Sequence, residues 1–126
     1  RWLSEALGTI HSQRQGQVIS VSLIGQLDRE VYARANEDLA QLFSEVEQPR
    51  VLLDLRSFEG WMGLSALREH LALIRDYRRA PERVALVSAA PWRPLAERLL
   101  AQFSGADTRL FSGVDLLEAQ EWICAD

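Results

Sequence analysis

Residues 51–61 read VLLDLRSFEGW, and this stretch decides the fold of the chain. It starts as an apolar run and changes near Arg56 into polar, glycine and aromatic residues. A strand that does not alternate apolar with polar residues is typical of a parallel sheet covered by helices on both faces. Ligands of such sheets gather outside the carboxyl ends of the strands. The stretch therefore predicts a central strand that enters a functional loop.

The rest of the chain alternates strand and helix patterns around this stretch. Strands are expected at residues 9–12, 18–24, 51–55, 84–87 and 108–111, and helices after Asp28, from the glycines at 60 and 63, after Pro91 and after the capping-box pattern at 112–115. The order β-β-α-β-α-β-α-β-α predicts an α/β domain with a mixed sheet of four to five strands and about four helices. The first two strands should form an antiparallel hairpin. Right-handed crossovers should make the last three parallel, with 51–55 and 84–87 adjacent, central and buried.

The second helix is expected to bury one stripe of side chains at helical spacing. This stripe consists of Leu64, Leu67, Leu71, Ile74 and Arg78. His70 lies off the stripe and is expected to be solvated or half-buried. His11 is expected on an edge strand.

Composition bounds the class of protein. The chain has 126 residues, 48% of them hydrophobic, which suits one domain at residues 9–126 after a short extension at residues 1–8. Its net charge of −4 does not favour a nucleic-acid partner. Cys124 is the single cysteine and the histidines number two, so neither a disulfide, a metal site nor a cofactor is predicted. The lone cysteine fits a reducing cytoplasm, and the absence of apolar runs of transmembrane length predicts a soluble protein.

Three segments carry a resemblance to a known family. They are DLRSFEGW at residues 54–61, PWRPL at 91–95 and DLLEAQEW at 115–122. Together they resemble the bacterial SpoIIAA-like family, also described as STAS or Sec14-type domains, from about Gln17 to the C-terminus. The resemblance implies a small α/β domain with a binding or regulatory role.

The candidate site lies at the cleft between the starts of the second and third helices. An apolar or amphipathic small ligand, or a protein partner, would contact Arg56, Phe58, Glu59, Trp61, Met62, Leu64, Trp92 and Arg93. A structural role is open for several of these residues. Trp61 could pack as core, Trp92 could be a lid over the sheet, and Arg56 could pair with a nearby acid.

Ser65 raises the alternative of a phosphorylation-controlled interaction switch. In the STAS proteins that act as anti-sigma-factor antagonists, a D-S-S-G-L-G segment carries a phosphorylated serine. An ungapped match places Leu64 at that serine and Met62 at the acid, with Ser65 one position later. A small hydrolase is the last alternative. The chain has no G-x-S-x-G elbow, and Ser65 and His70 fall on different faces of a helix, so we expect no enzyme.

The arginines around Tyr77 leave peripheral membrane contact open. This basic group consists of Arg75, Arg78, Arg79 and Arg83. Asp76 and Glu82 lie among them, and arginines near a helix C-terminus also complement the helix dipole. A homo-oligomer is likewise left open.

Overall fold

The computed structural model describes residues 8–77, 80–103 and 105–125. The extension at residues 1–7 lies outside these ranges. So do Arg78, the last member of the expected stripe, and Arg79 of the basic group.

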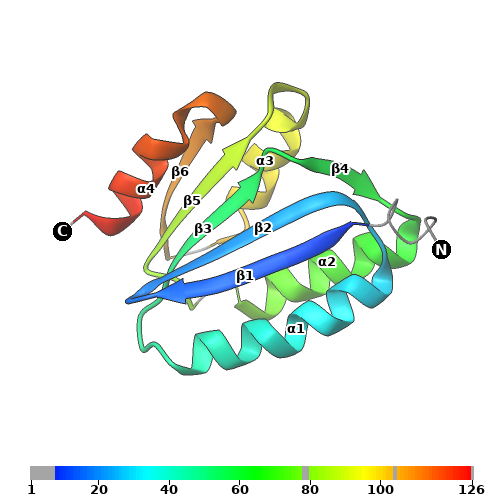
Figure 1. Ribbon diagram of the computed structural model, residues 1–126, viewed down its shortest axis with the longest axis horizontal. Helices are drawn as coiled ribbons and strands as arrows, with labels where there is room; N and C mark the ends of the chain where they lie inside the picture. The colour runs from blue at the N-terminus through cyan, green and yellow to red at the C-terminus, as the bar shows by residue number, and fades with distance from the viewer. Residues whose placement is uncertain (1–7, 78–79, 104, 126) are drawn as a thin grey trace.

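The described residues form one sheet and four α-helices (Figure 1). The elements are β1 (Thr9–Gln15), β2 (Val18–Leu27), α1 (Arg29–Ser44), β3 (Arg50–Leu55), β4 (Phe58–Trp61), α2 (Leu64–Tyr77), β5 (Arg83–Ser88), the 3₁₀ turn η2 (Ala90–Trp92), α3 (Arg93–Leu100), β6 (Asp107–Ser112), the 3₁₀ turn η3 (Gly113–Asp115) and α4 (Leu116–Cys124). Asp28 is the N-cap of α1, as predicted, and its carboxylate accepts from the Val31 amide at 3.0 Å.

The sheet confirms the predicted α/β class. Its strands follow the order β1-β2-β3-β5-β6, in which β1 and β2 are antiparallel and β2, β3, β5 and β6 are parallel. The central strands β3 and β5 are neighbours, as predicted, and β1 lies at an edge and carries His11.

The sheet has six strands, one more than expected, because residues 58–61 form β4. The strand pairs in parallel with the end of β2, where the register shifts between Gly25 and Gln26. Gly25 has a φ of 75°, and its amide donates to the Ser57 carbonyl at 2.8 Å. A four-residue strand with a glycine inside it has little sequence signal, so the sequence predicted a loop here.

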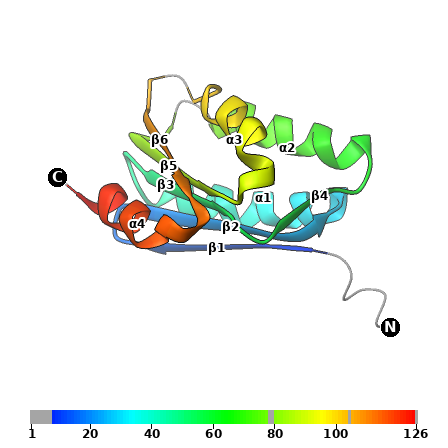
Figure 2. The ribbon, with the colours of Figure 1, turned by 90° about the horizontal axis from the view of Figure 1, so that it is seen from above.

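Two apolar cores lie on opposite faces of the sheet. Figure 2 shows α2 and α3 on one side of the sheet and α4 on the other. On β5, Val84 and Leu86 belong to the larger core under α1, α2 and α3. Ala85 and Val87, which alternate with them, belong to the smaller core under α4. Because helices cover both faces, β5 is apolar at successive positions.

The expected buried stripe of α2 is wrong at Leu64 and Leu71, whereas Ile74 packs against the larger core as expected. Leu64 is 70% exposed and Leu71 is 49% exposed, whereas Ala66 is fully buried and His70 is 6% exposed. Ala66, His70, Leu73 and Tyr77 also recur at helical spacing, so periodicity alone cannot choose between the two stripes. The burial of His70 also contradicts the expectation that this residue is solvated or half-buried.

No described helix is long and apolar enough to cross a membrane.

Two isoleucines on β2 test the burial pattern. Ile19 is fully buried and Ile24 is exposed. We expect Ile19→Ala to lower the free energy of unfolding by about 2–5 kcal/mol, through lost transfer energy and a cavity. Ile24→Ala, the same chemical change, should cost less than about 1 kcal/mol. Chemical denaturation measures both, and equal losses would contradict the assigned faces of β2.

Candidate functional site

The predicted aromatic residues gather where β4 meets α3. The Phe58 ring lies 5.0 Å from Trp61 and 4.9 Å from Trp92, between ring centroids. The Trp92 indole donates to the Phe58 carbonyl at 2.9 Å. Phe58 is buried and both tryptophans are half-buried against the larger core. These contacts support a structural role for the three rings.

Arg56 pairs with a local acid, and that acid is Asp54. The guanidinium donates to both carboxylate oxygens at 2.9–3.2 Å, and the Arg56 amide donates to Asp54 Oδ1 at 3.0 Å. The hydrogen bond with Asp54 raises the pKa of Arg56. Asp54 therefore holds the short connection between β3 and β4, which is how the DLR segment shapes the loop.

The remaining predicted residues face solvent. Arg93 pairs with Glu97 at 3.5 Å, one helical turn away, and Glu59 is exposed. Met62 and Leu64 are exposed at the start of α2, and Ser65 is exposed in its first turn. The structure thus divides the predicted site into an aromatic cluster and an exposed apolar helix start.

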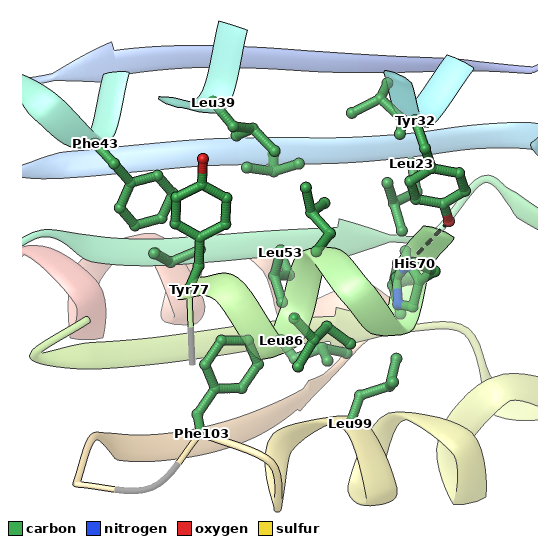
Figure 3. Close-up of a pocket in the computed structure, with 16 residues that line it drawn as sticks. Leu23, Tyr32, Leu39, Phe43, Leu53, His70, Tyr77, Leu86, Leu99 and Phe103 are labelled. Atoms are coloured by element: carbon green, nitrogen blue, oxygen red, sulfur yellow. Dashed lines mark hydrogen bonds between the residues drawn. The ribbon is translucent and has the colours of Figure 1, made fainter. Parts of the chain in front are cut away.

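A cavity of about 70 Å³ lies elsewhere, between the sheet and the helices (Figure 3). Its 16 lining residues are Ile10, Val21, Leu23, Tyr32, Leu39, Phe43, Val51, Leu53, Leu55, His70, Leu73, Ile74, Tyr77, Leu86, Leu99 and Phe103. Leu53 faces this cavity and is only half-buried, although the central strand was expected to be buried throughout. Phe43 and Tyr77 stack at 4.5 Å between ring centroids, and Figure 3 places this pair at the end away from Tyr32 and His70.

A chain of hydrogen bonds reaches the cavity from β4. The Trp61 indole donates to the Tyr32 hydroxyl oxygen at 2.7 Å, and that hydroxyl lies 2.8 Å from His70 Nδ1. Burial raises the pKa of Tyr32 well above its usual value, so the phenol keeps its proton. Burial also lowers the pKa of His70 from 6.5 to about 4, so its imidazole is neutral near pH 7.

A sequence profile of one family matches residues 18–124, and its description is SpoIIAA-like. The chain belongs to the SpoIIAA-like family. Among solved structures, an uncharacterized protein from Shewanella loihica PV-4 with a SpoIIAA-like fold has a TM-score of 0.74 and 21% identity over 93% of each chain. An anti-sigma factor antagonist from Mycobacterium paratuberculosis has a TM-score of 0.60 and 15% identity, over 94% of this chain and 95% of that one. At these identities both structures support the fold. No curated protein matches the sequence significantly.

Sequence reasoning on this SpoIIAA-like chain missed the cavity and the hydrogen-bonded pair of Tyr32 and His70 among its lining residues. Tyr32 lies next to Val31 on α1, and His70 lies one turn from Ala66 on α2. The helical pattern could therefore have indicated that both side chains are buried. The usable signal was the second stripe of α2, at Ala66, His70, Leu73 and Tyr77. A histidine in such a stripe is a candidate for a buried polar contact.

The buried imidazole of His70 should make the SpoIIAA-like domain sensitive to acid. The unfolded state takes up this proton near pH 6.5 and the folded state only near pH 4, so stability is complete above 6.5 and falls as the pH drops through that window. The loss should reach roughly 3 kcal/mol. We expect His70→Phe to remove this part of the pH dependence in denaturation experiments. His11→Phe, the matched change on the edge strand, should keep it, and a His70→Phe profile parallel to wild type would contradict the buried neutral imidazole.

Proposed function

We propose that this protein is a non-catalytic binding or regulatory domain that takes a small apolar or amphipathic ligand in the cavity beneath α1 and α2. The sequence predicted a ligand site at the cleft between the helices that begin near Trp61 and Trp92. The ligand site proposed here is the cavity instead of that cleft. Tyr32 lines the cavity, and the Trp61 indole donates a hydrogen bond to the Tyr32 hydroxyl.

The observation that carries the proposal is the lining of the cavity. All but three of its side chains are purely hydrocarbon, and the exceptions are Tyr32, His70 and Tyr77. Close-packed interiors rarely keep such space, because each void forfeits dispersion contacts. An engineered cavity of about 150 Å³ with an apolar lining binds benzene in another protein. At about 70 Å³ this cavity suits a smaller molecule, or the end of a longer one.

The non-catalytic part of the proposal rests on how Ser65 and His70 lie. A serine nucleophile needs a base within hydrogen-bond distance. Ser65 is exposed on α2, whereas His70 is buried and its Nδ1 contacts the Tyr32 hydroxyl. These positions favour binding over hydrolysis.

A protein partner, with or without a switch at Ser65, is the second candidate. The outer face of α2 exposes Met62, Leu64 and Leu71, and Ser65 lies beside them at the helix N-terminus, where a phosphate is electrostatically favourable. The anti-sigma factor antagonist shares this fold, which agrees with an interaction role. A phosphate on Ser65 in cell extracts would favour this candidate. Membrane contact through the arginines around Tyr77 and a homo-oligomer stay predictions.

Filling the cavity tests the ligand proposal. Leu53→Phe adds bulk to the cavity wall, whereas Leu71→Phe makes the same change on the exposed face of α2. With isobutene, a molecule smaller than benzene, as an apolar probe, we expect NMR shifts at cavity residues in the wild type and in Leu71→Phe. Leu53→Phe should bind the probe about tenfold more weakly, because its ring occupies the same space. Equal binding by the two variants, or no binding by the wild type, would refute the proposal.

A further inference from the structure

The two ends of the cavity are closed in different ways. At one end, Tyr32 and His70 are 1% and 6% exposed and share a hydrogen bond. At the other end, Phe43 and Tyr77 are only half-buried, and their rings stack on each other (Figure 3). Opening the first end would break a buried hydrogen bond, whereas opening the second separates two rings that already reach the surface. The end at Phe43 and Tyr77 is therefore the easier one to open.

Tyr77 lies at the boundary between the cavity and solvent. Its side chain lines the cavity, but the accessible lining of the cavity is entirely apolar, so its hydroxyl does not face inward. Among the described residues this hydroxyl has no hydrogen-bond partner, and it is not a buried unpartnered atom, so water reaches it. A tyrosine with its ring on an apolar wall and its hydroxyl in water is typical of an apolar–aqueous boundary. Tyr77 thus marks the side from which a ligand can enter.

The lining and the size of the cavity limit which part of a ligand it can hold. The accessible walls offer neither a donor nor an acceptor, so a polar group inside would lose its hydrogen bonds to water without replacement. A volume of about 70 Å³ has room for the end of a hydrocarbon chain, but not for a whole amphiphile. A polar head would therefore stay outside, where water and the Tyr77 hydroxyl can solvate it.

We propose that the cavity takes the hydrocarbon end of an amphiphile, which enters between Phe43 and Tyr77 and leaves its polar head in water beside the Tyr77 hydroxyl. The chain end would lie along Leu53 and point toward Tyr32, as the order of these side chains in Figure 3 allows. This inference rests on the proposed function and deepens it, because it names the part of the ligand that is bound and the direction from which it enters.

1-Hexanol tests this orientation in the wild-type protein. Its hydroxyl marks the head, and its terminal methyl group marks the chain end. In intermolecular NOE spectra, we expect the methyl protons to contact Leu53, and the protons next to the hydroxyl to contact the rings of Phe43 and Tyr77. The reverse orientation would overturn the inference, and so would contacts confined to the exposed face of α2.

The rate of ligand exchange tests the entrance separately. Tyr77→Ala removes one ring of the stacked pair, so isobutene should leave the cavity about tenfold faster than in the wild type, measured by NMR exchange spectroscopy. Leu71→Ala truncates an exposed side chain on the same helix and should leave the rate unchanged. An unchanged rate in Tyr77→Ala would place the entrance elsewhere and overturn the inference. If this variant does not fold, the NOE contacts of the wild type decide the question.

The outcomes also separate the two proposals. If isobutene enters the cavity and 1-hexanol contacts only the outer surface, the proposed function stands and this inference fails. If neither molecule enters, the proposed function fails and this inference fails with it.

Discussion

The hydrogen bonds that join Trp61, Tyr32 and His70 tie β4 to α1 and α2, the two helices whose side chains line much of the cavity. Trp61 ends β4, Tyr32 belongs to α1 and His70 belongs to α2. Buried polar groups must find partners, so these contacts restrict how the two helices rotate over the sheet. With His70 buried, Leu64 and Leu71 lie on the exposed face of α2. One set of side chains thus helps to fix how both helices pack on the sheet.

The break between β3 and β4 makes this arrangement possible. β2 pairs with β3 along residues 18–22 and with β4 along residues 25–27. Between the two pairings, Asp54 holds the Arg56 amide and guanidinium. β4 then continues beside β2, and Trp61 at its end donates a hydrogen bond to the hydroxyl of Tyr32. The segment at residues 54–61 therefore shapes the site and supplies one residue of the cavity wall, Leu55.

The sequence predicted the parts of the fold that have strong local signals. Continuous apolar strands such as residues 84–87 indicate a parallel sheet covered on both faces, and the N-cap at Asp28 marks a helix start. The face of α2 was not predictable in this way, because two stripes share the same spacing and tertiary contacts decide between them. The cavity depends on side chains from several elements, among them Leu53 and His70. The position of the cavity depends on three-dimensional packing, which cannot be predicted from the periodicity of one helix.

The tautomer of His70 tests the account most directly. Long-range nitrogen–proton NMR of the imidazole at neutral pH distinguishes a protonated Nε2 from a protonated Nδ1. The hydrogen bonds from Trp61 to Tyr32 and from Tyr32 to His70 predict an unprotonated Nδ1 and a protonated Nε2. A protonated Nδ1 in the free protein would contradict the account, because the Tyr32 hydroxyl would then accept from both Trp61 and His70 and could not donate its own proton to Nδ1.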